Sequence, residues 1–402
     1  MDATKLDHIF EEFKKEVSEF AKDEKNRCNF YDYEKKFREI TQKYEQEVFQ
    51  TTIGAVPASK NKKKTVKCTF GSVALPNESP LCQCPGGFQI SPLLQDHMTR
   101  IGSKLVFEES SEELELLLGI NVNAKQIERV CHYYGELLER IEWREAYSDG
   151  VQLKLQFKPE EDIYVMVDGS MLLTREEKWK EIKLGRIFTS GSMGTISKDR
   201  GKITDTLYAS HLGNAEAFWE KWSKEIPGNG KLVFINDGAK WIWNYIDDHY
   251  PNSIQILDFF HCKEHIYGFA KLFFKKDKAQ AERFVNLVTD LLFAKQVDCA
   301  LDEVSSLKCS NKTMLKEKEK LLKYLTTNKK RINYGEYIKQ GWLIGSGAIE
   351  AAHRDVLQKR LKLSGQRWTI KGAQQMANLR TYKKSNNWNQ VKSLIVNNKE
   401  AA

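Results

Sequence analysis

Hydrophobic positions in the first fifty residues recur every three or four residues, as Phe10, Phe13, Val17 and Phe20 do. A period near 3.6 is typical of helices that bury one face, so we expect two amphipathic helices in this region. The pattern breaks between residues 51 and 87, where four prolines and several glycines favour loops or short strands.

The helical period returns between residues 91 and 139. This segment predicts one helix, a turn at Gly119 and a second helix that begins near Asn123. The spacing is typical of a helix-turn-helix near residues 108–140, although a helical hairpin that packs and binds nothing has the same pattern. If the unit binds DNA, the exposed side of its second helix offers Lys125, Gln126 and Arg129.

From Asp162 onwards, short apolar runs replace the helical period. The runs "DIYVMVDGS", "WKEIKLGRIFTS" and "TDTLYASHLG" predict three strands, with a Gly/Ser turn region around Ser190–Gly201 before the third. An aromatic helix, "NAEAFWEKWSKEI", precedes a fourth strand, "KLVFIN", which is followed by another helix and a fifth strand, "SIQILDFF". The order strand-strand-strand-helix-strand-helix-strand predicts an α/β fold, a mixed sheet with helices packed against it.

The stretch from residue 271 to 340 is charged, helical in period and without strand signals, so we expect a helical insertion there. After Gly345 a long helix is expected, with Ser346 as its N-cap and Glu350 in its first turns. The chain is thus expected to contain a mainly helical region over residues 1–150, a sheet-containing core over residues 151–270 and 341–390, and the insertion over residues 271–340.

Composition narrows the class of protein. The content of hydrophobic residues, 41%, supports substantial buried cores. No apolar run reaches about eighteen residues, the length of a transmembrane helix. The charged N-terminal sequence differs from a secretory signal, and the eight scattered cysteines suit reduced thiols, so a cytoplasmic protein is expected.

The net charge of +8 includes two basic clusters, Ser59–Lys67 and His353–Lys384. A single cluster of this kind is as often a solvated helix face as a binding surface. Two clusters in one chain favour a polyanionic partner.

Two of the predicted strands end in Asp-Gly, at Asp168 and at Asp237. One such pair usually marks a turn, but two on neighbouring strands would hold both carboxylates at one edge of the sheet. Glu350, on a helix able to cross that edge, would add a third carboxylate. Carboxylates are hard oxygen ligands for Mg²⁺ or Mn²⁺, and two such ions ~4 Å apart can assist both sides of a phosphodiester displacement. The sequence therefore predicts a two-metal site at these three acids.

Two other patterns raise the question of zinc. His261, Glu264 and His265 form H-x-x-E-H, a zinc-peptidase signature in which the two histidines would share a helix face. Five residues with three fixed positions match by chance fairly often, so a metallopeptidase is only a remote alternative. Three cysteines look like the remains of a zinc knuckle but lack a standard ligand set, and we do not expect zinc at Cys68, Cys82 and Cys84.

The longer motifs carry a resemblance. The stretches "VDGS…WKEIKLGRIF", "NDGAKWIWN…HYPNSIQILDFFHCKEHI" and "GWLIGSGAIEAAHRDVLQKRLKLSGQRWTIKGAQQMANLR" resemble the DDE transposases, and more narrowly the bacterial insertion-sequence transposases of the ISKra type. The resemblance spans residue 162 to about 388, whereas the N-terminal third matches only in general layout. It implies a ribonuclease-H-like core in which Asp168 is the first catalytic acid, Asp237 the second and Glu350 the third.

The resemblance also implies an activity: metal-dependent cleavage at the ends of a mobile element, followed by strand transfer by the freed 3′-hydroxyl. The implied partners are Mg²⁺ or Mn²⁺ and double-stranded DNA, namely the terminal repeats and the target. Because two DNA ends must be brought together, we expect a homo-oligomer on DNA, associated with the nucleoid. The alternative is a catalytically silent DNA-binding protein derived from a transposase.

Several related transposase groups carry a C/D-x-x-H signature on the strand after the second acid, and Asp258 and His261 fit it. Asp258 therefore competes with Asp237 for the second catalytic place. We favour Asp237, because its Asp-Gly repeats the pair at Asp168, and assign Asp258 and His261 a supporting role.

Basic residues near Glu350 complete the predicted site. Arg354, one turn later, could contact the scissile phosphate or could simply pair with Glu350. Further candidate contacts to DNA phosphates or unpaired bases are Arg360, Lys362, Arg367 and Trp368.

Overall fold

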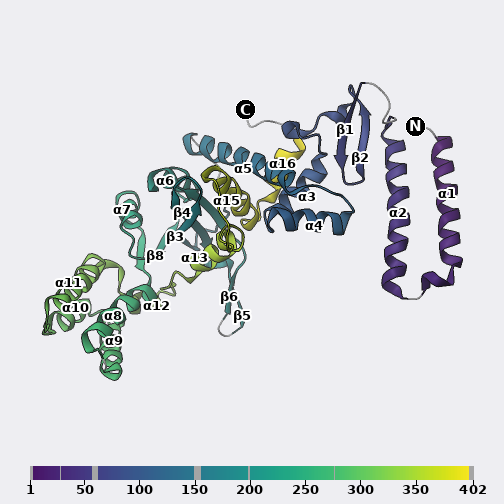
Figure 1. Cartoon of the computed structure of the whole chain (residues 1–402). Helices are drawn as coiled ribbons and strands as arrows, with labels where there is room; N and C mark the ends of the chain where they lie inside the picture. The colour runs from purple at the N-terminus through teal and green to yellow at the C-terminus, as the bar shows by residue number, and fades with distance from the viewer. Residues whose placement is uncertain are drawn as a thin grey trace. The chain divides into compact units, whose positions relative to one another are not determined.

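The computed structural model describes residues 3–27, 29–56, 62–148, 155–197, 200–275 and 277–397 (Figure 1). The basic cluster expected at Ser59–Lys67 therefore lies partly outside the described residues. The chain folds as two compact units, Met1–Leu138 with Asn389–Ala402, and Glu139–Trp388. The division falls inside a long helix, earlier than the boundary expected at residue 150, and each unit is described by itself.

The first unit is mainly helical. Its first helices, α1 (Ala3–Lys22) and α2 (Phe30–Thr52), confirm the prediction from the apolar period. They pack along each other (Figure 1), and Phe20 of α1 contacts the rings of Tyr33 and Phe37 of α2. The other named elements of this unit, of which α5 and α16 extend past its boundary, are β1 (Lys63–Cys68), β2 (Gly71–Pro76), α3 (Pro92–Gly102), α4 (Phe107–Leu118), α5 (Ala124–Tyr147) and α16 (Trp388–Asn397).

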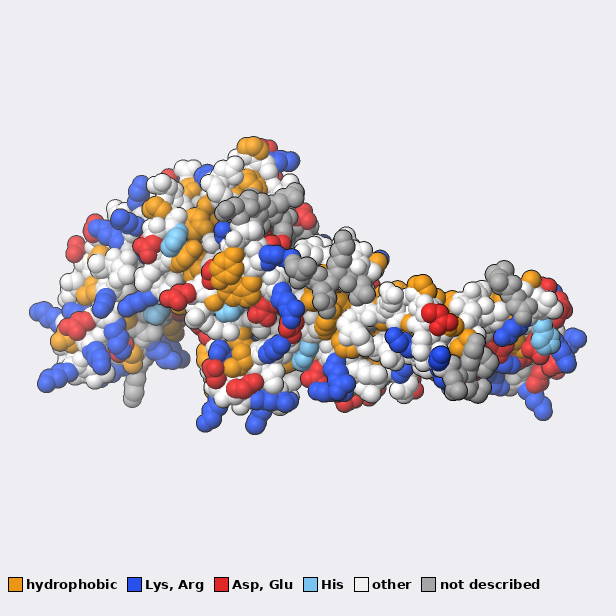
Figure 2. Space-filling model, turned by 90° about the horizontal axis from the view of Figure 1, so that it is seen from above, with side chains coloured by type: hydrophobic (Ala, Val, Ile, Leu, Met, Phe, Trp, Pro, Cys, Tyr) orange, Lys and Arg blue, Asp and Glu red, His pale blue; other side chains and the backbone are white. Residues whose placement is uncertain are grey.

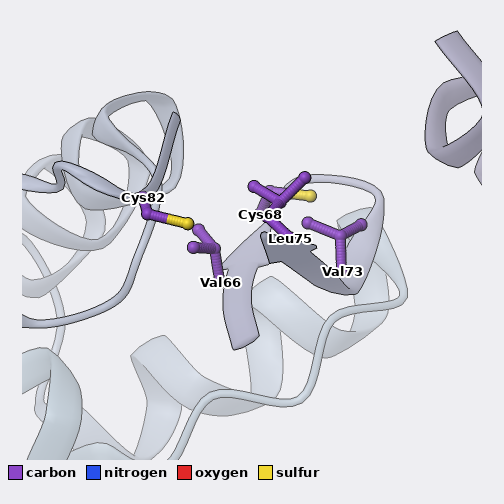
Figure 3. Packing of buried hydrophobic residues seen from close by; sticks show 5 residues of the cluster. All are labelled: Val66, Cys68, Val73, Leu75 and Cys82. Carbon is purple, nitrogen blue, oxygen red and sulfur yellow. The ribbon is translucent and has the colours of Figure 1, made fainter. Parts of the chain in front are cut away.

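The proline-rich segment contains an antiparallel hairpin of β1 and β2. Its buried core consists of Val66, Cys68, Val73, Leu75 and Cys82 (Figure 3). Figure 3 shows the Cys82 side chain pointing toward Val66. The thiols of Cys68, Cys82 and Cys84 each donate to a backbone carbonyl, and burial raises the pKa of Cys68 and of Cys84. Two of the three cysteines are therefore part of this apolar core, and the third packs against it.

Two helices and a turn lie where the helix-turn-helix was expected. Gly119 follows α4 with φ +67°, in the left-handed region that favours glycine. Asn123 precedes α5, and its side-chain oxygen accepts from the Gln126 N–H at 2.8 Å, which caps that helix. The DNA-binding role of this pair of helices stays a prediction.

The second unit contains a five-stranded mixed sheet with strand order β7-β4-β3-β8-β9. Its strands are β3 (Asp162–Thr174), β4 (Lys178–Thr189), β7 (Leu207–Leu212), β8 (Lys231–Asn236) and β9 (Ile254–Leu257). The first three are antiparallel neighbours, whereas β8 and β9 run parallel to β3. Helix α6 (Ala215–Trp222) precedes β8 and α7 (Lys240–His249) precedes β9, so the predicted order of strands and helices is confirmed.

The Gly/Ser region between the second and third predicted strands was read incompletely. It contains a separate two-stranded hairpin, β5 (Met193–Ser197) and β6 (Arg200–Ile203), instead of a turn alone. These strands are short and contain few apolar residues, so they carry almost no alternating pattern.

Helix α15 (Ile370–Lys384) covers the edge strand β7. Gln374 of this helix accepts from the Leu212 N–H at 2.6 Å and donates to the Ser210 carbonyl at 3.1 Å. An edge strand leaves backbone groups unpaired, and this one side chain satisfies two of them. The covered edge explains why the sequence of α15 is buried on all sides from Gly372 to Tyr382.

Residues 271–340 are helical, as predicted, in the part of this segment that the structure describes. The helices from the end of β9 onwards are α8 (Phe259–Phe274), α9 (Lys278–Phe293), α10 (Val297–Ser306), α11 (Lys312–Thr327) and α12 (Tyr334–Lys339). The helical segment that carries Glu350 consists of α13 (Gly347–Ala352), a π-helical turn (His353–Gln358) and α14 (Lys359–Leu361). None of the described helices is both long and apolar enough to cross a bilayer.

Candidate active site

Asp168 and Asp237 lie on neighbouring parallel strands. The paired register of β3 and β8 ends at Val165 opposite Phe234, and three further residues along each chain bring Asp168 level with Asp237. Asp237 directly follows the last residue of β8, as predicted. Asp168 does not end its strand, because β4 pairs with β3 as far as Thr174. The prediction of a strand end there was wrong. At Asp168, β3 still pairs with β4 on one side but no longer pairs with β8 on the other.

Gly169 has a different role from the one expected. It lies within the β3–β4 ladder, and a Cβ at this position would come within 2.3 Å of Glu181 Oε1. Glu181 in turn accepts from Lys183 Nζ at 2.6 Å. The glycine therefore makes room for a cross-strand side chain and not for a turn.

The Asn236 side chain bonds to β3 just beyond the last backbone pair between β3 and β8. Its fully buried side-chain oxygen accepts from the Val167 N–H at 2.6 Å, and its carbonyl accepts from the Asp258 N–H at 2.8 Å. One side chain thus replaces the missing ladder bond, and the start of α8 is fixed to the end of β8.

Asp237 is half-buried and only partly used by its neighbours. One carboxylate oxygen accepts from the Ala239 N–H at 3.0 Å, and the backbone carbonyl accepts from the Trp243 indole at 2.5 Å. A Cβ on Gly238 would come within 2.7 Å of the Tyr324 ring, so the glycine allows α11 of the insertion to approach. The second carboxylate oxygen of Asp237 has no hydrogen bond from the described residues.

Asp258 is buried and fully occupied by backbone donors. One oxygen accepts from the His261 N–H at 2.7 Å and caps α8, and the other accepts from the Ser346 N–H. Ser346 is the N-cap residue of α13, as predicted, but its side chain makes no capping bond, and the backbone bond to Asp258 holds the start of the helix. Asp258 therefore positions the segment that carries Glu350, whereas Asp237 has a free carboxylate oxygen for chemistry.

Glu350 is exposed on the short helix α13. The long regular helix predicted here is interrupted by the π-helical turn, a feature that is frequent at functional sites. Arg186 of β4 donates to the Ala348 carbonyl at 2.6 Å and ties α13 to the sheet. Arg380 of α15 donates to two carbonyls of the π-helical turn and holds it from the other side.

The pKa of Asp168 depends on the other two predicted acids. Burial raises the pKa of Asp168 to about 6, and the negative charges of Asp237 and Glu350 add to the increase. The Gly169 N–H and His261 oppose it. Asp237 and Glu350 therefore lie near enough to Asp168 to affect its ionisation. That the three acids form one site stays a prediction.

His353 is a site residue that sequence reasoning missed. Its Nε2 lies 3.3 Å from Asp168 Oδ2, and its Nδ1 lies 3.0 Å from Ser170 Oγ. Burial lowers the pKa of His353 to about 4, and nearby Lys362 lowers it further, so the imidazole is neutral near pH 7. The sequence did offer one signal for His353. It is a polar residue three positions after Glu350, on a helix expected to cross the sheet.

The histidines of H-x-x-E-H are engaged by different partners. His261 Nδ1 lies 3.2 Å from Asp258 Oδ1. Burial lowers the pKa of His261, but Asp258 together with the charges of Asp237 and Glu264 outweighs burial, so that this pKa is raised. The His265 ring packs on the Tyr324 ring, with centroids 4.2 Å apart, and burial lowers its pKa. The motif lies on α8, as expected, but its two imidazoles do not share one set of contacts.

The three acids suit a metal ion by the chemistry of their oxygen donors and not by their present geometry. Within the described residues no group of three or more His, Cys, Asp or Glu side chains has the geometry to hold a metal ion. Asp168, Asp237 and Glu350 are nevertheless hard oxygen donors whose mutual repulsion favours the protonated form of Asp168, and a divalent cation would relieve it. Glu350 is exposed, and its carboxylate has no hydrogen bond or ion pair among the described residues.

The basic residues predicted to contact DNA near Glu350 divide into two groups. Arg354 and Arg367 are exposed, and no ion pair joins Arg354 to Glu350 among the described residues. Lys362 is half-buried, and its pKa, lowered by burial, is partly restored by the Asp168 charge, which places it near that carboxylate.

Arg360 and Trp368 form a buried pair. The Arg360 guanidinium is fully buried, 5.0 Å from the centroid of the Trp368 ring. The Trp368 indole donates to the Leu361 carbonyl at 3.1 Å. Neither side chain presents a surface to DNA in this structure, so the prediction of a DNA contact is not supported for these two residues.

The residues predicted to contact DNA in the first unit lie at the start of α5. Lys125 and Arg129 are exposed, and Gln126 is half-buried. Lys125 forms an ion pair with Glu128 at 2.6 Å on the same helix. Their contact with DNA stays a prediction.

Comparison with known proteins gives one distant similarity. No family model matches the chain. The chain is 22% identical over 306 residues to a UPF0236 protein in the vanSb 3′ region of Streptococcus gallolyticus, a match over 72% of this chain and 63% of the relative. The chain thus spans less than two thirds of that relative's length. At this identity the similarity does not define a family, so the function is argued from the site.

Proposed function

We propose that this protein is a DNA transposase of the DDE type, which binds the ends of a mobile element and performs metal-dependent strand cleavage and strand transfer. The observation that carries the proposal is the placement of Asp168 and Asp237 on neighbouring parallel chain segments, with Glu350 on a helix that packs against β3 and β4. Such an arrangement suits a phosphodiester site that loads divalent metal.

The fold supports the same assignment. Three antiparallel strands are followed by two parallel strands, each of which comes after a helix, and the third acid lies on a helix that packs against β3 and β4. This is the arrangement expected for a ribonuclease-H-like core. A helical insertion separates the second acid from the third, as in the transposases that the sequence resembles.

The chain's own residues divide the work at the site. Asp168, Asp237 and Glu350 would hold Mg²⁺ or Mn²⁺, which supplies an activated hydroxyl and stabilises the leaving oxygen. His353, hydrogen-bonded to Ser170, lies beside the Asp168 carboxylate and would orient it. Asp258 fixes the loop before Glu350. Lys362 and Arg354 would contact the DNA phosphates next to the reacting one.

The partners follow from the reaction. Double-stranded DNA carrying the element's terminal repeats and a target duplex are the proposed substrates. Strand transfer requires two element ends together, so we propose that the active form is a homo-oligomer assembled on DNA.

The test uses a labelled duplex with the terminal repeats that flank the gene, incubated with the full chain and Mg²⁺ or Mn²⁺. We expect cleavage and strand transfer by the wild type and a loss of at least about 1000-fold with Asp168→Asn, Asp237→Asn and Glu350→Gln, because each removes transition-state stabilisation of several kcal/mol. The control is Asp277→Asn, a helix cap outside the site. Sequence-specific binding without any cleavage would favour the catalytically silent alternative. Zinc-dependent peptide hydrolysis lost with His261→Ala would favour the peptidase.

A further inference from the structure

A groove lies beside the Asp237 edge of the second unit. It runs between α7, the segment leading into β9 and the C-terminal end of α11 with the turn that follows it (Lys329–Arg331), and its volume is about 1190 Å³. Gly238, the residue directly after Asp237, lines it. Small-molecule pockets usually measure ~300–1,000 Å³, so an open groove of this size suits an extended ligand.

The groove is strongly basic. Its only lining carboxylate, among the described residues, belongs to Asp247, and both oxygens of that carboxylate accept from Arg331 Nη2, at 2.6 and 2.7 Å. The cationic lining residues are Lys240, Lys320, Lys323, Lys329, Lys330 and Arg331. Six cations against one carboxylate give the lining a charge of +5, compared with +8 for the whole chain. The groove is thus one concentration of positive charge, in addition to the basic cluster at His353–Lys384.

Three of these lysines are free to bind a ligand. Lys240, Lys323 and Lys330 are exposed and pair with no carboxylate among the described residues. The ammonium groups of Lys320 and Lys329 pair with Glu317 and Asp298, two acids outside the groove. On the face shown in Figure 2, many lysine and arginine side chains lie on the helical insertion, as they do elsewhere on this face.

We propose that this groove binds the phosphate backbone of DNA on one side of the scissile phosphate. The inference rests on the proposed function in that DNA is the ligand at the neighbouring acids. Lysine ammonium groups are flexible point charges that suit phosphates without selecting a base sequence. Because Gly238 lines the groove and directly follows Asp237 in the chain, DNA bound in the groove would pass next to that acid.

The test compares two triple variants of the full chain. One carries Lys240→Gln, Lys323→Gln and Lys330→Gln in the groove. The matched control carries Lys308→Gln, Lys312→Gln and Lys316→Gln, which are exposed, unpaired and in the same insertion but outside the groove. Both variants lower the net charge by the same amount. Affinity for a labelled duplex of arbitrary sequence is measured in EDTA between about 50 and 200 mM salt.

The groove variant should lower the slope of log affinity against log salt by about 3, because each lost phosphate contact removes about 0.9. The control should change the slope by less than about 1. The inference would be overturned if neither variant changed the slope, or if both variants lowered the slope by the same amount. Thermal unfolding of both variants verifies that they fold.

These outcomes are separate from those of the cleavage test. If the groove variant has the lower salt slope while Asp168→Asn leaves cleavage unchanged, DNA binding by the groove is supported and the proposed active site is contradicted. If cleavage depends on Asp168 but the groove variant behaves as the control does, the active site stands and the groove fails.

Discussion

At the scale of single residues, Asp168 is the acid most affected by its surroundings. Its side chain is one-third exposed, yet burial and two neighbouring carboxylates raise its pKa to about 6. A carboxylate that resists ionisation near neutral pH is expected where a cation completes the site. The same group would be an ordinary Asp in the unfolded chain.

This difference predicts a pH-dependent stability effect in the absence of divalent metal. The unfolded chain releases the Asp168 proton near pH 3.8 and the folded chain near pH 6. The folded state is therefore penalised as pH rises from about 4 to 6, and the full penalty persists above 6. Asn resembles the protonated acid, so Asp168→Asn should raise the melting temperature in EDTA at pH 7.5 and have no effect near pH 4. Thermal denaturation at several pH values measures this, and a lower melting temperature for the variant at pH 7.5 would contradict it.

His353 leads to a second prediction at this scale. It contacts Asp168 and Ser170 and is buried, so we expect it to act as a positioning residue. Substituting such residues next to metal ligands typically costs about 10–100-fold in metal affinity or activity. His353→Ala should therefore lower cleavage and Mn²⁺ affinity by about that factor and leave DNA affinity unchanged. A variant that loses DNA affinity instead would assign His353 a direct contact.

At the scale of elements, Asp258 joins two segments that are far apart in the sequence. One oxygen caps α8 and the other holds the backbone of Ser346 before α13. Asp258→Asn keeps an oxygen for the cap but presents an amide NH₂ to the Ser346 N–H, so only the second link breaks. We predict a loss of cleavage with a modest loss of stability, about 1–3 kcal/mol, because one buried donor is left unsatisfied.

The matched control is Asp277→Asn, which caps α9 through the Gln280 N–H at 2.9 Å and has no second link. It should leave cleavage unchanged. Cleavage and unfolding free energy of both variants are the measurements. If Asp258→Asn cleaves DNA as the wild type does, then Asp258 does not position Glu350.

The sheet could be predicted from the sequence because its strands are continuous apolar runs separated by helices of regular period. The last four residues of "KLVFIN" and the last two of "SIQIL" are buried in the sheet. The position of Asp168 within β3 could not be predicted, since the strand is extended by pairing with β4, a contact made after a turn. The Asp-Gly pair has the same local sequence in both places, and only long-range pairing distinguishes them.

The errors at the third acid have a related origin. The sequence after Glu350 has helical period, and its π-helical turn depends on Arg380 from a later helix. Arg360 carries a charge, which favours a surface position in a sequence-based argument. It is buried because the Trp368 ring packs against its guanidinium. Such partners become visible only when the chain is folded.

At the scale of the whole molecule, the charge distribution matters more than the total. A net charge of +8 is compatible with many functions, but the groove beside Asp237 holds six of the basic side chains. Field lines from such a groove raise the local concentration of a polyanion next to the acids. The groove can therefore guide a polyanion toward the acids.

The central claim is that Asp168, Asp237 and Glu350 form one metal site, and Mn²⁺ binding followed by electron paramagnetic resonance tests it most directly, since no DNA sequence needs to be known. We predict that the wild type binds two Mn²⁺ ions, which couple magnetically at a separation of about 4 Å. Asp168→Asn and Glu350→Gln should each lose at least one of the ions, and Asp277→Asn should lose neither. Equal Mn²⁺ binding by the wild type and both site variants would contradict the claim.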